Sequence, residues 1–148
     1  CFCQLFQILP CIDNIIPVYK KIFFFLLFRP FLPFCLKIPG YRLLFKKSGS
    51  GFYATIEQDA NCFVPALAYK ISEYDEALLN RYEGYPKYYY KKYFQLPVRT
   101  LKGGRLKGNK QCMVYVLHEE RLLGEPTMEY YKLLDDGYAR WGSRTASA

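Results

Sequence analysis

The segment SEYDEALLNRYEGYP, residues 72–86, contains both a start signal and a stop signal for one short helix. Ser72 begins an S-x-x-D sequence, which is close to the capping box found at helix N-termini. Gly84 and Pro86 end the helix, because glycine favours the left-handed turn after a last helical residue and proline cannot continue it. Between these signals the helix would present one apolar face, formed by Leu78, Leu79 and Tyr82.

The sequence on both sides of this helix is typical of strands and turns. Before the helix we expect strands at 41–46, 52–57 and 62–71, separated by the turns SGSG (48–51) and DAN (59–61). Pro65 favours an edge or a bulge in the third of these strands. After the helix we expect strands at 89–101 and 111–118, a basic loop at 102–110 and a last helix that Thr127 can cap. This order predicts an α+β fold, with a small mixed β-barrel or curved sheet and two main helices.

Residues 1–39 differ from the rest of the chain. They contain no glycine, a single acid (Asp13) and the dense apolar run IFFFLLFRPFLPFCL. Arg29, Pro30 and Pro33 interrupt this run, so it is shorter than the roughly 20 apolar residues of a bilayer span. Two interpretations stay open: a segment that associates weakly with a membrane, and a misjoined or out-of-frame segment that replaces a native first strand. We favour the second, with residues 40–142 as the domain and 143–148 as a tail.

The net charge of +8 favours attraction to anions, but it does not identify them. Lysines are interleaved with tyrosines at residues 85–93, a pattern that could stack bases or could form a solvated lysine face over a tyrosine-lined core. We prefer the second interpretation and expect no nucleic-acid partner. Six cysteines without a CxxC pair, together with one histidine, predict no metal site. We interpret Cys62 and Cys112 as buried, reduced thiols of a cytoplasmic protein, with a disulfide framework as the weaker alternative.

Glu83 is the acid with the most unusual position in the sequence, at the end of the predicted helix and among the tyrosines of LLNRYEGYPKYYYKK (78–92). The negative end of the helix dipole disfavours an ionised carboxylate there. Aromatic rings that exclude water would also raise its pKa. A carboxyl group tuned in this way can act first as a general base and then as a general acid. The other interpretation is a solvated acid at a helix end, which is common on protein surfaces.

The sequence ALLNRYEGYPKYYYKKYF, preceded by CFVPALAYKISEYDE, resembles the gamma-glutamylcyclotransferase-like family and its YEG motif. GYRLLF and YATIEQDAN are similar to the preceding strands of that family, and EPTMEYYKLLDDGYARWG is similar to its closing segment. The resemblance covers about residues 40–142. Asn80 stands where the family often has aspartate, and Ala66 stands where it usually has glycine. Both changes look tolerable.

This resemblance implies an enzyme without a cofactor that cyclises a gamma-glutamyl group to 5-oxoproline and releases an amine or an amino acid, as in glutathione metabolism. It implies that Glu83 is the general acid/base. It further implies that Tyr90 and Tyr130 bind the substrate or line its pocket, with Tyr88 as a third candidate. An ordinary structural role in the core remains the alternative for these tyrosines.

The chain departs from the family at one important place. The family has a Tyr-Gly-Ser-Asn loop after its first strand, whose backbone N–H groups hold the substrate, and residues 1–39 contain no such sequence. SGSG at 48–51 lies too late in the sequence and is better interpreted as a hairpin turn. Two rival functions therefore stay open: a catalytically impaired relic that binds small acids, and a basic module that binds RNA or a membrane.

Overall fold

The computed structural model describes residues 5–9 and 34–137. Its strands are β1 Leu5–Leu9, β2 Phe34–Ser48, β3 Gly51–Ile71, β4 Tyr89–Thr100 and β5 Leu106–Leu117, and its helices are α2 Glu73–Glu83 and α3 Met128–Gly137.

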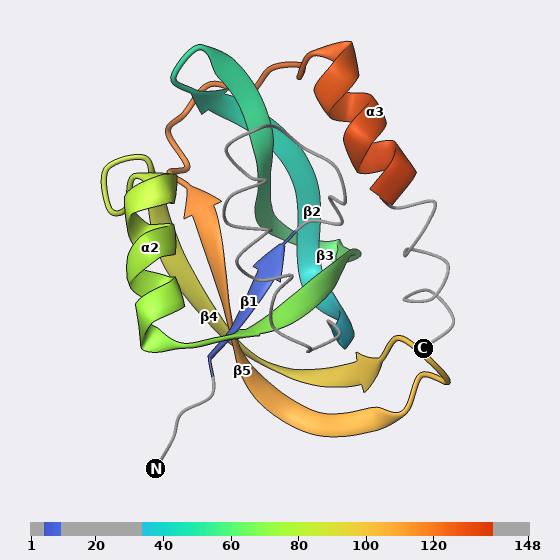
Figure 1. Cartoon of the computed structure of the whole chain (residues 1–148). Coiled ribbons are helices and arrows are strands. Elements are labelled where there is room, and N and C mark those ends of the chain that lie inside the picture. The colour runs from blue at the N-terminus through green and yellow to red at the C-terminus, as the bar shows by residue number, and fades with distance from the viewer. Residues whose placement is uncertain (1–4, 10–33, 138–148) are drawn as a thin grey trace.

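The five strands form a closed barrel in the order β1-β3-β2-β4-β5 (Figure 1). β1 pairs antiparallel with β3 and parallel with β5, while the remaining neighbours are antiparallel. The two helices lie on different sides of the barrel, and α3 lies beside the hairpin of β2 and β3 (Figure 1). The predicted fold class, an α+β fold with a small mixed barrel and two main helices, is therefore confirmed.

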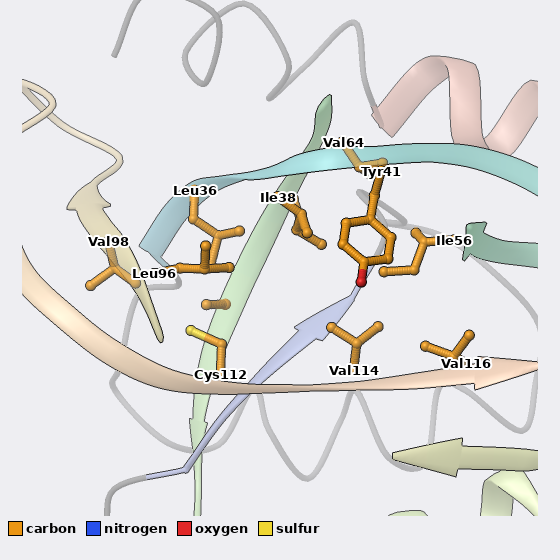
Figure 2. Close-up of a cluster of buried hydrophobic side chains, with 12 residues drawn as sticks. Leu36, Ile38, Tyr41, Ile56, Val64, Leu96, Val98, Cys112, Val114 and Val116 are labelled. Atoms are coloured by element: carbon orange, nitrogen blue, oxygen red, sulfur yellow. The ribbon is translucent and has the colours of Figure 1, made fainter. Parts of the chain in front are cut away.

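The interior of the barrel holds one apolar cluster to which β2, β3, β4 and β5 contribute (Figure 2). Alternate residues of each strand point inward, because successive side chains of a strand face opposite sides. Complete burial of one aliphatic side chain contributes about 1.5–3 kcal/mol to folding. The cluster consists of Leu36, Ile38, Tyr41, Ile56, Val64, Ala66, Ala68, Leu96, Val98, Cys112, Val114 and Val116.

β3 is one long strand where the sequence predicted two strands and a turn. The expected turn exists locally, because the backbone N–H of Asn61 donates a hydrogen bond of 3.1 Å to Oδ1 of Asp59. Gln58 pairs with Tyr41 of β2 and Phe63 pairs with Pro39, so the residues between them form a bulge in the ladder. This bulge exposes Cys62, and the prediction of a buried thiol at that position is wrong. Cys112 is buried as predicted.

The hairpin of β4 and β5 is longer than the sequence predicted. Asn109 pairs with Pro97 and Lys110 pairs with Leu96, so most of the predicted loop at 102–110 belongs to β5. The connection itself bends at Gly103 and Gly104, whose φ angles are 76° and 58°. The sequence did not indicate a strand in this part of β5, because it is rich in lysine and glycine and neither residue type is enriched in strands.

The predicted start of the first helix is confirmed at α2. Oγ of Ser72 accepts a hydrogen bond of 3.2 Å from the backbone N–H of Asp75, and Oδ2 of Asp75 accepts one of 2.8 Å from the N–H of Ser72. These reciprocal bonds form a capping box and satisfy two backbone donors at the helix N-terminus. Asp75 is buried, so water does not replace the bonds.

Replacing Ser72 with alanine should lower the free energy of unfolding by about 1 kcal/mol, because one capped N–H loses its acceptor. Urea denaturation measures the change. Ser50→Ala, in the exposed turn between β2 and β3, is the matched control and should leave stability nearly unchanged. Equal effects of the two substitutions would contradict a stabilising role for this cap.

β1 lies inside the segment that the sequence set apart as residues 1–39, and β2 begins at Phe34 and continues through position 40. The domain boundary at residue 40 and the origin of the leader remain predictions. Most of the apolar run in the leader and the tail at 143–148 lie outside the described residues. The helices that the structure does describe are too short or too polar to cross a bilayer.

Candidate active site

Glu83 is the last residue of α2, as the sequence predicted. Gly84 follows it in the left-handed conformation, with φ 66°, and the N–H of Tyr85 donates a hydrogen bond of 2.9 Å to the carbonyl of Asn80. A side chain at position 84 would place its Cβ 2.5 Å from Cδ2 of Tyr88. Both the backbone conformation and this contact favour glycine, so the turn directly after Glu83 packs against the Tyr88 ring.

The end of α2 is fixed against the barrel by polar contacts. The hydroxyl of Tyr115 on β5 donates a hydrogen bond of 2.7 Å to Oδ1 of Asn80. One turn earlier, Glu76 forms an ion pair with Lys91 of β4. Lys91 also lies 4.6 Å from the ring centre of Tyr85, so this lysine is packed and does not belong to the solvated face that the sequence suggested.

The carboxyl group of Glu83 lies among protein atoms although the residue as a whole keeps some exposure. Burial raises the pKa of Glu83 from 4.5 to about 7. The sequence predicted this direction, and burial is one of the two causes that it suggested. At neutral pH such a carboxyl group is present in both the protonated and the ionised form, which suits proton transfer in both directions.

Besides the hydroxyl of Tyr115, those of Tyr89 and Tyr130 lie within electrostatic reach of Glu83. Burial is the main cause of a raised pKa at Tyr89, and the charge of Glu83 raises it further. Burial, with a smaller contribution from Glu83, raises the pKa of Tyr130 to about 12. Tyr130 also accepts a hydrogen bond of 3.2 Å from the N–H of Ala54, and its ring meets that of Tyr53 edge to face at 5.5 Å. Both hydroxyls keep their protons at neutral pH and can donate hydrogen bonds.

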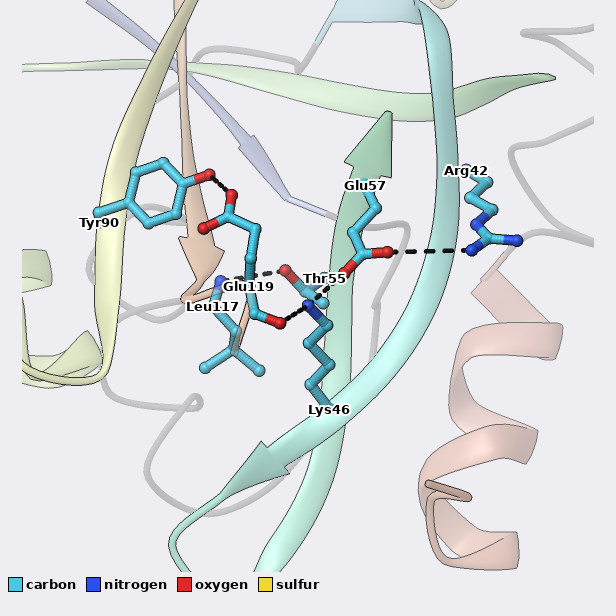
Figure 3. Close-up of polar contacts among 7 residues, drawn as sticks. All are labelled: Arg42, Lys46, Thr55, Glu57, Tyr90, Leu117 and Glu119. Atoms are coloured by element: carbon cyan, nitrogen blue, oxygen red, sulfur yellow. Dashed lines mark hydrogen bonds and ion pairs between the residues drawn. The ribbon is translucent and has the colours of Figure 1, made fainter. Parts of the chain in front are cut away.

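Tyr90 lies in a different environment from Tyr89. Neighbouring residues of a strand point to opposite faces, and the Tyr90 ring packs against the cluster inside the barrel. Its hydroxyl donates a hydrogen bond to Glu119 (Figure 3). Its ring centre lies 5.5 Å from that of His118. Of the tyrosines singled out in the sequence, the structure thus groups Tyr130 with Glu83 and places Tyr90 with Glu119.

Tyr88 is exposed and lies on the turn that follows Glu83. The guanidinium carbon of Arg121 lies 5.2 Å from the centre of its ring. Arg121 lowers the pKa of Tyr89, in the direction opposite to the effect of Glu83. Sequence reasoning missed Arg121 and Tyr53 and gave Tyr89 little weight. The sequence around Arg121 does not indicate its role, because Arg121 follows β5 and its contacts depend on how distant strands pair.

Within the part of the chain that the structure describes, no group of three or more His, Cys, Asp or Glu side chains could hold a metal ion. Around Glu83 the described residues supply one titrating carboxyl group, protonated tyrosine hydroxyls and one guanidinium. These groups can transfer a proton and stabilise a developing negative charge.

The closed mixed barrel and its two flanking helices define a protein of the gamma-glutamyl cyclotransferase-like fold. The family model described as gamma-glutamyl cyclotransferase, AIG2-like, matches residues 27–136, and the chain belongs to this family. The resemblance seen in the sequence is thus confirmed. None of the curated protein sequences matches the chain.

Solved structures support the same fold. A protein described as gamma-glutamyl cyclotransferase superposes with a TM-score of 0.65 at 18% identity, covering 93% of this chain and 79% of that one. YkqA from Bacillus subtilis gives a TM-score of 0.68 at 20% identity, covering 93% of this chain and 49% of that one. An uncharacterized protein from Homo sapiens, loc79017, gives 0.57 at 20% identity, covering 74% and 66%. These similarities establish the fold.

Proposed function

We propose that this protein is a gamma-glutamylcyclotransferase with Glu83 as its general acid/base. The observation that carries the proposal is the pKa of Glu83, which burial raises to about 7, at the end of α2 in a member of this family. An ordinary surface carboxylate, with a pKa near 4, would be too weak a base and would not be able to return the proton at neutral pH.

In the proposed reaction, the neutral alpha-amino nitrogen of a gamma-glutamyl substrate attacks the side-chain amide carbonyl and forms the C–N bond of a five-membered ring. As this bond forms, the ionised carboxylate of Glu83 takes one proton from the attacking nitrogen. As the tetrahedral intermediate collapses, the original amide C–N bond breaks, and Glu83 returns its proton to the leaving nitrogen. The products are 5-oxoproline and a free amine or amino acid, so atoms and protons balance without a cofactor.

The surroundings of Glu83 support two further parts of this mechanism. Because the attack is intramolecular, holding the substrate in a folded conformation supplies much of the rate. The hydroxyls of Tyr89 and Tyr130 retain their protons and can donate to the oxyanion that forms on the attacked carbonyl. These donors would share the work that a Tyr-Gly-Ser-Asn loop does in the family.

The direct test is release of 5-oxoproline from gamma-glutamyl amines and gamma-glutamyl amino acids. We expect turnover by the purified chain without an added cofactor, measured by chromatography of the product. The second candidate function is a family member that binds small acids without turnover, and the glycine-free sequence of residues 1–39 favours it. Binding of 5-oxoproline without turnover of any gamma-glutamyl compound would establish that second function and overturn the first.

A further inference from the structure

The segment after β5 is fixed to β2 by three hydrogen bonds. Nζ of Lys46 donates to the carbonyl of Glu119 at 2.8 Å (Figure 3). The backbone N–H of Lys47 donates to the carbonyl of Leu122 at 2.8 Å, and the N–H of Gly124 donates to that of Phe45 at 3.2 Å. Arg121 lies in the middle of this segment, so its backbone is held in place.

The guanidinium of Arg121 joins two separate parts of the site but uses only some of its donors. Nη1 donates to the carbonyl of Lys47 at 3.2 Å, and Nη2 donates to the carbonyl of Lys87 at 3.3 Å. Nε is buried and has no hydrogen-bond partner among residues 5–9 and 34–137. Within the described part of the chain, no carboxylate forms an ion pair with Arg121.

An unpaired buried donor is unusual in a folded protein, and a charged one is more costly than a neutral one. Each backbone carbonyl accepts from one of the two hydrogens on its Nη group, so each Nη keeps one free hydrogen, and neither carbonyl neutralises the charge. A carboxylate would neutralise the charge and accept from the free Nη hydrogens, because its two oxygens match the fork geometry of a guanidinium. The unfilled requirement at Arg121 is therefore for a planar anion.

Arg121 and Glu83 lie around the same two tyrosines, Tyr88 and Tyr89. The two groups act on the hydroxyl of Tyr89 in opposite directions, so both lie within electrostatic range of that hydroxyl. Arg121 also packs over Tyr88, which contacts the turn directly after Glu83. In a gamma-glutamyl compound the alpha-carboxylate and the alpha-amino group are attached to the same carbon, so fixing one places the other.

We propose that Arg121 binds the alpha-carboxylate of the glutamyl unit and thereby selects substrates that carry a free carboxylate there. This inference rests on the proposed function. Binding at Arg121 would turn the neighbouring amino group toward Glu83, so Arg121 is a residue that determines specificity, whereas Glu83 performs the proton transfers. If Arg121 were only a link between β2 and the turn after α2, it would affect stability without distinguishing one ligand from another.

Calorimetric titration with 5-oxoproline and with its amide tests this assignment. Native protein should bind the acid, and Arg121→Gln should weaken that binding about tenfold or more, since a hydrogen-bonded charge is lost. The amide should bind the native and variant proteins equally. Arg105→Gln, an exposed arginine in the β4–β5 hairpin, is the control for the loss of one charge and should leave both affinities unchanged.

If Arg121→Gln fails to fold, Arg121→Lys takes its place, because it keeps the charge and loses the fork. We expect Arg121→Lys to bind 5-oxoproline several-fold less tightly than the native protein does. It should bind the amide as tightly as the native protein does. Equal weakening toward acid and amide, unchanged affinity for the acid, or no binding of the acid by the native protein would each overturn the assignment.

The assignment and the proposed reaction can fail separately. The protein could bind 5-oxoproline in a way that depends on Arg121 and yet turn over no gamma-glutamyl compound. That result would support carboxylate binding by Arg121 and would refute the proposed reaction. Arg121→Gln could instead lower turnover equally for substrates with a free and with an amidated alpha-carboxylate. That result would support the proposed reaction and would refute carboxylate binding by Arg121.

Discussion

Glu83→Gln should lower kcat/KM for release of 5-oxoproline by about 10²- to 10⁴-fold, which is the usual contribution of a general acid/base. Glutamine keeps the size of the side chain and the position at the end of α2, but it cannot accept and return a proton. Affinity for 5-oxoproline should change little, since the variant leaves Arg121 and the tyrosines in place. Glu73→Gln, an exposed acid in the first turn of the same helix, is the matched control and should keep full activity.

The pH profile gives an independent measure of the same carboxyl group. Because the pKa of Glu83 is raised to about 7 and the base must be ionised, kcat/KM should rise with pH through that value. Residual activity of Glu83→Gln should not show this rise. A native profile that is flat between pH 5 and 8, or a variant as active as the Glu73→Gln control, would remove Glu83 from the reaction.

The same raised pKa makes a stability prediction whose sign is opposite to that of most acids. Between pH 4.5 and about 7 the folded protein holds a proton on Glu83 that the unfolded chain releases. The contribution of Glu83 to the free energy of unfolding is therefore fully present below pH 4.5 and is lost as pH rises through about 7. Since the residue keeps some exposure, we expect a loss of about 1–2 kcal/mol, absent in Glu83→Gln.

The sequence predicted the site best where local chemistry decides the conformation. Ser72 caps the start of α2 and Gly84 caps its end, through hydrogen bonds and backbone conformations that involve near neighbours only. The position of Glu83 could therefore be predicted from a short stretch of sequence. The choice between Tyr89 and Tyr90 was different. It depends on which face of β4 turns inward, and a shift of one residue exchanges the two faces. A run of three tyrosines carries no alternation that fixes this choice.

Contacts between distant segments could not be predicted at all. Arg121 reaches the carbonyls of Lys47 and Lys87, which are separated from it by 74 and 34 positions in the sequence. Lys46 is another example. Its place in the sequence, near a hairpin, is typical of a solvated lysine, yet Lys46 is only 1% exposed. Pairing of β2 with β3 brings Glu57 to it, and the segment after β5 covers it. These positions depend on the register of the closed barrel.

Glu57→Gln should be strongly destabilising although it leaves the active site untouched. Glu57 is the ion-pair partner of Lys46, whose other acceptor within the described ranges is the carbonyl of Glu119 (Figure 3). Removing one partner leaves an ammonium group buried without a counter-charge, which typically costs 3–5 kcal/mol. Because Glu57 is itself 26% exposed and water can reach that side, we expect the lower end, about 3 kcal/mol.

Two further variants separate burial of the charge from loss of a salt bridge. Lys46→Met removes the buried charge with a side chain of similar length, so it should destabilise clearly less than Glu57→Gln. Arg42→Gln removes the second cation near Glu57, at 3.9 Å and 52% exposed, and should change stability by less than about 1 kcal/mol. Urea unfolding at low and high salt measures all three. If Glu57→Gln were no worse than Arg42→Gln, or if salt abolished its effect, the Lys46 ammonium would be reached by water and would not depend on Glu57.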